Sequence, residues 1–195
     1  MQTISALTLE GECATVSEEA SQVQAAQQDP AAFAPLYRRY QDRVYRYVRT
    51  RTESDEDAAD LTQQVFLRAL DSLSQYRPRR GSFTAWLFGI ARNALTDWHR
   101  RQRKTVTWDL LPEALQPVAD HDLEAGMLRR EAVARLRTLF AELDADKQEI
   151  LVLRFAAQLT IAEIAAIIGK SEAATQKMLL RTIQALQESY HDETP

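Results

Sequence analysis

Cationic and aromatic residues are concentrated between residues 77 and 104, in the stretch RPRRGSFTAWLFGIARNALTDWHRRQRK. Eight Arg or Lys residues stand there against one acid, Asp97, which gives a net charge of +7, although the whole 195-residue chain carries −4. Cations neutralise phosphates and aromatic rings stack on unpaired bases, so this mixture predicts a surface for single-stranded nucleic acid. The plainer alternative is a solvated basic helix end. It would explain residues 100–104 but not the arginines of the preceding loop.

Charge divides the rest of the chain into segments. Residues 1–28 hold four acids and no Lys or Arg, whereas residues 29–104 hold 15 basic and 9 acidic residues, a balance of +6. The stretch after residue 104 is again acidic and contains Pro112 and Pro117, which is typical of a linker. We therefore predict a flexible acidic tail at 1–28, a domain at 29–104, a flexible linker at 105–122 and a second domain at 123–190.

Helical periodicity runs through both predicted domains, and no segment alternates as a strand would, so the expected fold class is all-α. Ser54 is placed to cap a helix, with Asp57 at the reciprocal position, and Ser82 is placed to cap another after the Pro- and Gly-containing loop. In the helix after Ser82, one stripe is apolar. The opposite, solvent-facing stripe contains Gly89, Arg92, Asn93, Thr96, Asp97, Arg100, Arg103 and Lys104.

The second domain contains the segment LTIAEIAAIIGKSEAATQKMLLRTIQAL. Thr160 with Glu163 forms a potential capping box, Gly169 can end the first helix, and Ser171 can cap the next. Helix, short glycine turn and helix together predict a DNA-binding helix-turn-helix. The expected inner face of the second helix is Ala174, Met178, Leu179, Ile183 and Leu186. Its outward positions are Glu172, Ala173, Gln176, Lys177, Leu180 and Arg181.

Three segments, DAADLTQQVFLRAL, GSFTAWLFGIARNALTDWHRRQRK and the helix-turn-helix segment, resemble regions 2.2, 2.3 to 2.4 and 4.2 of bacterial RNA polymerase sigma factors of the sigma-70 family. The similarity is to the extracytoplasmic-function (ECF) class, which has only those two domains, and it covers residues 29–190. It departs from the family pattern at Gln64, where Glu is common, at Gly89, where a basic residue is common, and at Met178 and Leu180.

The resemblance implies a function in promoter recognition and −10 strand opening, and it implies site residues for it. The expected contacts with the −10 element are Tyr76, Arg77, Arg79, Arg80, Ser82, Trp86, Arg92, Asn93, Asp97, Arg100 and Arg101. The expected contacts with the −35 element are Ser171, Glu172, Gln176, Lys177 and Arg181. The expected polymerase-docking residues are Asp57, Asp60, Gln64 and Arg68. The implied partners are core RNA polymerase (its β′ clamp helices and β flap), promoter DNA and an anti-sigma factor.

Other function classes have little support in the sequence. Cys13 is the only cysteine, the three histidines are dispersed, and neither a nucleophile–base pair nor a phosphate-cradling glycine loop is evident, so we expect no metal, no cofactor and no enzyme activity. No apolar run is long enough to cross a membrane, so a cytoplasmic protein is expected. Two alternatives remain: a stand-alone helix-turn-helix regulator that binds duplex DNA as a dimer, and a helical interaction protein that contacts no nucleic acid.

Overall fold

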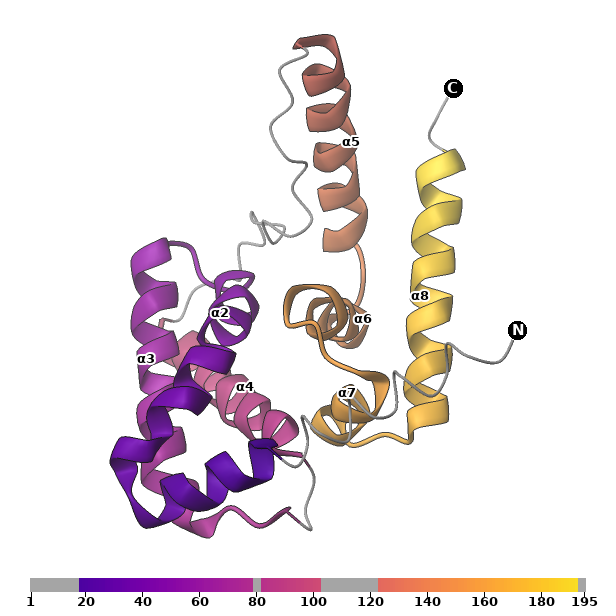
Figure 1. The fold of residues 1–195 in the computed structure, drawn as a ribbon. Helices are drawn as coiled ribbons and strands as arrows, with labels where there is room; N and C mark the ends of the chain where they lie inside the picture. Colours follow the sequence, from indigo (N-terminus) through magenta and orange to yellow (C-terminus); the bar gives the residue numbers. More distant parts are fainter. Residues whose placement is uncertain (1–17, 79–81, 103–122, 193–195) are drawn as a thin grey trace, which may run out of the picture.

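The computed structural model describes residues 18–78, 82–102 and 123–192 (Figure 1). All regular structure within these ranges is helical, which confirms the predicted all-α class. The predicted linker 105–122, together with Arg79, Arg80, Arg103 and Lys104, lies outside the described residues. Among the helices that are described, none is both long and apolar enough to span a membrane.

The N-terminal domain begins earlier than predicted. Residues 18–28 form a helix whose Val23 and Ala26 are buried in the core. Gln27 of this helix donates to the carbonyl oxygens of Leu73 (2.9 Å) and Tyr76 (3.1 Å). The prediction of a flexible tail up to residue 28 is therefore wrong for residues 18–28, because their few apolar side chains and Gln27 pack on the domain. Residues 1–17 lie outside the described ranges.

A short 3-10 helix, η1 (Pro30–Phe33), leads into α2 (Ala34–Arg49). Tyr40, Val44 and Tyr47 of α2 are buried in the core. Tyr37 is 36% exposed and rests against Phe66 of the next helix, with ring centroids 4.7 Å apart. The hydroxyl of Tyr40 donates to Glu19 and lies 2.9 Å from Thr84 Oγ1. Burial raises the pKa of Tyr40 far above its ordinary value, so this hydroxyl stays protonated and can donate.

The next two helices start at the predicted caps. In α3 (Asp55–Ser72), Ser54 Oγ accepts from the backbone N–H of Asp57 at 3.0 Å. A 3-10 turn, η2 (Leu73–Gln75), follows. In α4 (Phe83–Gln102), Ser82 Oγ accepts from the N–H of Ala85 at 3.1 Å. The core of this domain is formed where α2, α3 and α4 pack on one another.

The C-terminal domain comprises α5 (Leu123–Ala141), α6 (Ala145–Leu151), a π-helix η5 (Val152–Ala156), α7 (Ile161–Ile168) and α8 (Glu172–Asp192). The cap of α6 is Asp144, whose carboxylate accepts from the N–H of Lys147 at 2.9 Å. Asp144 has the extended backbone that a cap needs.

The helix-turn-helix is confirmed in detail. Thr160 and Glu163 form the reciprocal capping box of α7, Gly169 ends it in the left-handed conformation (φ 70°), and Ser171 Oγ accepts from the N–H of Ala174. The inner face of α8 differs from the prediction because Ala174 is exposed, whereas Thr175 and Thr182 are buried. Each threonine hydroxyl bonds the carbonyl four residues earlier, which satisfies it inside the core.

The two domains pack directly against each other. In Figure 1, the C-terminal domain lies on the side of the N-terminal domain away from α3. Helix α4 contacts α7, and α2 contacts η5, so buried residues of both domains form one continuous core cluster. Two helical domains were predicted, but their mutual contact was not.

Candidate nucleic-acid interface

The cationic strip of α4 is an exposed surface. Arg92, Asn93 and Arg100 are exposed, at spacings that place them along one side of the helix. Arg101 is also exposed, but it lies half a turn away from Arg92. The side chains of Arg92 and Arg100 are 48% and 79% exposed, respectively. Gly89 lies on the same stripe, and a Cβ added there would meet no atom within 4 Å. The strip is thus available to a ligand along most of its length.

Asp97 is the one acid of the strip, and it connects two arginines. Its carboxylate accepts from Arg68 of α3 at 3.3 Å and from Arg100 of its own helix at 3.2 Å. It is about one third exposed. Arg68 was expected to face the polymerase and Asp97 to face DNA. The structure brings these two residues together across the α3–α4 contact.

The loop before α4 is built on an aromatic cluster. The ring of Tyr76 is only 6% exposed, and it packs on Phe83 and Trp86 with centroids 5.7 and 5.2 Å away. Trp86 is half-buried, and Ser82 is exposed. Arg77 is exposed and donates to the carbonyl oxygens of Ser74 (2.6 Å) and Tyr76 (2.9 Å). Tyr76 therefore supports the cluster from inside and presents no open face for stacking.

A second exposed row lies on α3. Asp60 and Gln64 are exposed as predicted, whereas Asp57 is half-buried and its carboxylate accepts from Ser54 Oγ at 2.7 Å. Leu67, one helical turn beyond Gln64, is 61% exposed. Sequence reasoning missed Leu67. The signal was the apolar run Val65, Phe66, Leu67, because three consecutive residues of a helix cannot all face one core.

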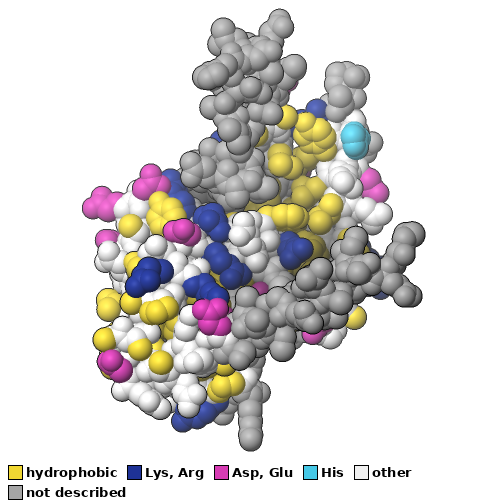
Figure 2. Space-filling view, in the orientation of Figure 1, with side chains coloured by type: hydrophobic (Ala, Val, Ile, Leu, Met, Phe, Trp, Pro, Cys, Tyr) yellow, Lys and Arg dark blue, Asp and Glu magenta, His cyan; other side chains and the backbone are white. Residues whose placement is uncertain are grey.

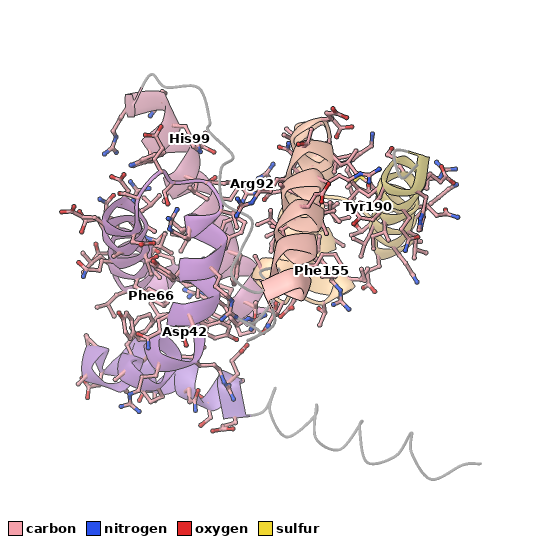
Figure 3. The ribbon with its side chains drawn as sticks, turned by 90° about the horizontal axis from the view of Figure 1, so that it is seen from above. Asp42, Phe66, Arg92, His99, Phe155 and Tyr190 are labelled. Carbon is pink, nitrogen blue, oxygen red and sulfur yellow. The ribbon has the colours of Figure 1, made fainter. Side chains whose placement is uncertain are left out.

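The outward face of α8 carries few charges. Glu172, Gln176, Lys177 and Arg181 are exposed, and so is the N-cap Ser171. Leu180 lies between Lys177 and Arg181 on this face and is 56% exposed. In Figure 3, Tyr190 near the other end of α8 points toward α5, where its ring lies 4.9 Å from the guanidinium of Arg135. The outward face at the start of α8 is thus open to solvent, whereas the end of the helix lies beside α5.

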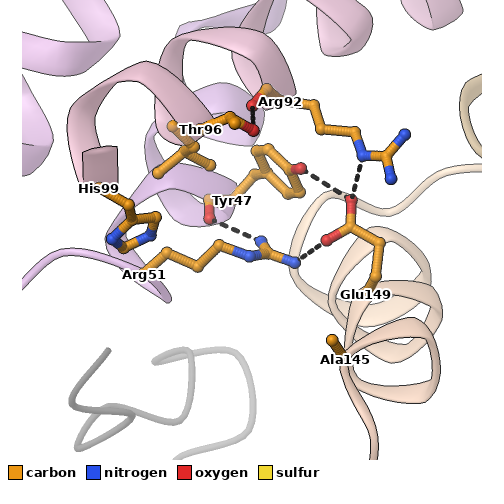
Figure 4. Close-up of a pocket in the computed structure, with 8 residues that line it drawn as sticks. Tyr47, Arg51, Arg92, Thr96, His99, Ala145 and Glu149 are labelled. Atoms are coloured by element: carbon orange, nitrogen blue, oxygen red, sulfur yellow. Dashed lines mark hydrogen bonds and ion pairs between the residues drawn. The ribbon is translucent and has the colours of Figure 1, made fainter. Parts of the chain in front are cut away.

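A largely buried carboxylate joins the domains beside the strip. Glu149 of α6 is 14% exposed and accepts from the Tyr47 hydroxyl at 2.9 Å and from Arg51 (Figure 4). Arg92 of the strip approaches the same carboxylate, Nε to Oε1, at 3.9 Å. Burial raises the pKa of Tyr47 far above its usual range, so its hydroxyl remains a donor. The sequence does not mark Glu149 as a residue that joins the domains, since its partners come from the other domain.

A cavity of about 180 Å³ lies beside Glu149, and it is lined by His99 together with Tyr47, Arg51, Arg92 and Glu149. Burial lowers its pKa below the usual 6.5, and the nearby Arg51 guanidinium lowers it further. Figure 2 shows Lys and Arg side chains gathered across the middle of this face, along the boundary between the domains. Four arginines of the N-terminal domain, Arg43, Arg46, Arg51 and Arg92, contact the C-terminal domain.

Comparison with known proteins supports both domains. The family model for Sigma-70 region 2 matches residues 36–105, and the one for Sigma-70, region 4 matches residues 134–186. The chain is 33% identical over 179 residues to the ECF RNA polymerase sigma factor BldN of Streptomyces coelicolor, covering 91% of this chain and 66% of BldN, about two thirds of its length. It is 32% identical over 137 residues to the RNA polymerase sigma factor YlaC of Bacillus subtilis, covering 70% and 79% of the two chains.

A solved structure of CnrH in complex with the cytosolic domain of CnrY has a similar fold, with a TM-score of 0.60 at 22% identity, covering 90% of this chain and 99% of that one. The order of the two matched regions agrees with the two domains described above. With both regions matched and relatives more than 30% identical over most of their length, the chain belongs to the ECF class of the sigma-70 family of RNA polymerase sigma factors.

Proposed function

We propose that this protein directs core RNA polymerase to promoters and holds the unpaired strand of the −10 element on α4. The observation that carries the proposal is the row of exposed donors on one side of α4, formed by Arg92, Asn93 and Arg100, with Arg101 exposed next to Arg100 at the end of the helix. Their guanidinium groups suit phosphates and the amide suits base edges. The protein would act in the cytoplasm as a subunit without catalytic activity of its own, because the chemistry of RNA synthesis belongs to the polymerase.

Strand opening needs a site for an extruded base beside these cations. Trp86 is half-buried above Tyr76 and Phe83, so one part of its ring is supported while another remains accessible. Ser82 is exposed at the start of the same helix. Extrusion costs a few kcal/mol, and stacking of about 1 to 3 kcal/mol per base together with phosphate contacts offsets that cost. In this scheme Asp97 orients Arg100 and does not itself contact the strand.

Polymerase docking is assigned to the exposed row of α3. Asp60, Gln64 and Leu67 share this row, which combines a charge, an amide and an apolar anchor on a rigid helix. Asp57 is engaged by the cap and Arg68 by Asp97, so both support the row from its ends. The β′ clamp helices are the partner that the family resemblance implies for this face.

The −35 element is assigned to α8, with the β flap of the polymerase as the second contact of its domain. Lys177 and Arg181 suit phosphates, Gln176 suits an adenine edge, and exposed Leu180 suits the methyl group of a thymine. Ser171 and Glu172 lie at the N-terminus of α8, where the backbone N–H groups of the first helical turn could also donate to a phosphate of the DNA. With only two cations on this face, α8 alone would bind duplex DNA weakly.

An anti-sigma protein is a further proposed partner. CnrH, which shares this fold, was solved in complex with the cytosolic domain of CnrY. We expect a comparable regulator here because the docking row of α3 and the strip of α4 are exposed and would need to be covered when transcription is to be prevented.

The test is binding to a promoter whose −10 segment is mismatched. Purified protein, core polymerase and both together are titrated against this labelled DNA in a mobility-shift assay. We expect a stable complex only when both are present, and we expect Arg92→Ala with Arg100→Ala to weaken it at least about tenfold, because two phosphate contacts are lost. Arg38→Ala is the matched control, since Arg38 is exposed on α2 away from the strip.

Two outcomes would overturn the proposal. One is tight binding of a palindromic duplex by the protein without polymerase, which a stand-alone dimeric regulator predicts. The other is unchanged binding when both Arg92 and Arg100 are replaced. That result would show that the strip does not contact the promoter, although the protein could still act as a sigma factor through another surface.

A further inference from the structure

A glutamine of the helix at residues 18–28 holds the backbone in front of α4. Gln27 Nε2 donates to the carbonyl oxygens of Leu73 at 2.9 Å and Tyr76 at 3.1 Å. Both partners are acceptors only, so the amide nitrogen must face them, and each of its two hydrogens is donated to one carbonyl. One side chain thereby fixes two peptide groups that lie directly before Arg77.

The same two carbonyls belong to a local hydrogen-bond network. The N–H of Tyr76 donates to the Leu73 carbonyl at 3.1 Å and closes the η2 turn. Arg77 donates to the Tyr76 carbonyl at 2.9 Å, so this oxygen accepts from Arg77 and Gln27 together. The ring of Tyr76 packs on Trp86, with centroids 5.2 Å apart. Gln27 therefore supports the backbone from which Arg77 projects and the ring on which Trp86 rests.

The backbone of Gln27 is itself fixed. Gln27 lies in the last turn of its helix, and the N–H of Asp29 still donates to the Ala25 carbonyl at 2.9 Å. Asp29 then takes an extended conformation and caps η1, where its carboxylate accepts from the N–H of Ala31 at 2.9 Å. Because buried Val23 anchors the helix in the core and Asp29 fixes where it ends, Gln27 contacts the loop from a rigid base.

A second contact ties the same helix to the other end of the loop. Glu19 accepts a hydrogen bond from the hydroxyl of Tyr40. This hydroxyl has a single hydrogen, so Thr84 Oγ1, which lies 2.9 Å away, donates to the Tyr40 oxygen. Thr84 is the second residue of α4 and is buried. The helix at residues 18–28 is therefore tied to the chain both before and after the loop.

The helix also forms one wall of the space beside the loop. A cavity of about 840 Å³ is lined by Glu19, Ala20 and Val23 of this helix and by Tyr76, Pro78 and Ser82 of the loop, and its remaining walls come from α2 and the start of α7. Ser82, one of the expected −10 contacts, thus faces a space whose shape depends on the helix.

From these contacts we propose that the helix at residues 18–28 is a positioning element of the −10 site, with Gln27 as its positioning residue. The inference rests on the proposed function and adds to it a residue that does not itself contact DNA. Holding both ends of a loop lowers the conformational entropy that is lost when the loop binds a base. Without Gln27, Tyr76 and with it Trp86 would sample several positions, whereas the exposed row of α3 would keep its shape.

Three variants of the full chain test the donor. Gln27→Met keeps the length of the side chain but removes both donated hydrogen bonds. Gln27→Lys restores a donor, because an ammonium group carries three N–H bonds and can donate to both carbonyls. Gln24→Met is the matched control, since Gln24 is exposed on the same helix. Circular dichroism and fluorescence anisotropy with core polymerase check that the fold and the docking are retained.

The first measurement is hydrogen exchange of the free protein, followed by mass spectrometry. We expect the peptide that covers residues 73–78 to exchange about tenfold faster in Gln27→Met than in wild type, and the middle of α3 to exchange at the wild-type rate. Gln27→Lys and Gln24→Met should match wild type throughout. Unchanged exchange at residues 73–78 in Gln27→Met would overturn the positioning role.

The second measurement tests capture of the base. The mismatched promoter is titrated with polymerase and each protein, with one base of the −10 segment at a time replaced by an abasic site. Wild type should lose at least about tenfold in affinity at one position, because a stacked base is removed. We expect this penalty to fall to about threefold or less in Gln27→Met and to return in Gln27→Lys. A protein that was only less stable would bind every promoter less well and keep the penalty.

The outcomes separate the inference from the proposed function. An undiminished penalty in Gln27→Met would overturn the inference alone, as would a Gln27→Lys protein that behaves like Gln27→Met, or loss of helicity or polymerase binding in Gln27→Met. If wild type shows no penalty at any position while exchange at residues 73–78 is faster in Gln27→Met, Gln27 positions the loop but the base capture of the proposed function fails.

Discussion

Asp97 of α4 accepts a hydrogen bond from Arg68 of α3 at 3.3 Å, so the helix with the proposed polymerase row is tied to the helix with the proposed DNA strip. The same carboxylate bonds Arg100 at 3.2 Å. We therefore expect a positioning role for this acid, between the surface proposed for polymerase and the surface proposed for DNA.

This link is expected to be weak in stability terms. The side chains of Arg68 and Asp97 are 38% and 34% exposed, respectively. Ion pairs exposed to this degree contribute about 0.2 to 1 kcal/mol to the free energy of unfolding. A double-mutant cycle with Arg68→Ala and Asp97→Ala, measured by urea unfolding, should give a coupling free energy within that range. A coupling of zero would show that the contact does not persist in solution.

Leu67 should be an anchor for the polymerase. It is 61% exposed, so Leu67→Ser is expected to leave the urea midpoint nearly unchanged while lowering affinity for core polymerase about tenfold or more, since an apolar side chain buried in an interface is lost. Arg68→Ala should have the smaller effect on this affinity. Fluorescence anisotropy with labelled protein measures both, and a Leu67→Ser protein that binds polymerase as wild type does would exclude this row from the interface.

Gly89 and Gly169 should respond oppositely to the same change. Gly169 has a φ of 70°, so Gly169→Ala forces a left-handed conformation on a residue with a Cβ and is expected to cost about 1 to 2 kcal/mol, although no atom lies within 4 Å. Gly89 is inside α4 with equal space, and Gly89→Ala should stabilise by about 0.5 to 1 kcal/mol. Thermal unfolding checks the signs; destabilisation by Gly89→Ala or none by Gly169→Ala would contradict them.

His99 should make stability depend on pH. Burial, and then Arg51, lower its folded pKa below the unfolded value near 6.5, so the unfolded chain binds more protons in this range. Its contribution is intact above pH 6.5 and is lost as the pH falls through and below that value. The free energy of unfolding should therefore drop more between pH 7.5 and 5.5 in wild type than in His99→Gln, and parallel profiles would refute the assignment.

Local features were predictable from the sequence. The caps at Ser54, Ser82, Thr160 and Ser171 and the turn at Gly169 all depend on residues within four positions of one another, and each is present. The order of helices follows from the same short-range periodicity.

Features that depend on distant partners were not predictable. Gln27 reaches carbonyls more than 40 residues away, and Glu149 meets Tyr47 and Arg51 across about 100 residues, so neither carries a local signal. Thr175 and Thr182 were not expected in the core because their side chains are polar. Both are buried, since each hydroxyl donates a hydrogen bond to a backbone carbonyl of the preceding turn. Helical periodicity identifies the apolar and polar faces of a helix, but it does not identify which other element packs on each face.

The most direct measurement places the unpaired strand on α4. A photo-crosslinking amino acid replaces Asn93, which is exposed in the middle of the strip, and a second protein carries it in place of Arg38 as a control. Each is assembled with core polymerase on a mismatched promoter with separately labelled strands. We predict that position 93 crosslinks to one strand of the −10 segment and that position 38 does not. Crosslinks from position 93 only to duplex DNA, or none above the control, would contradict the assignment of α4 as the strand-holding surface.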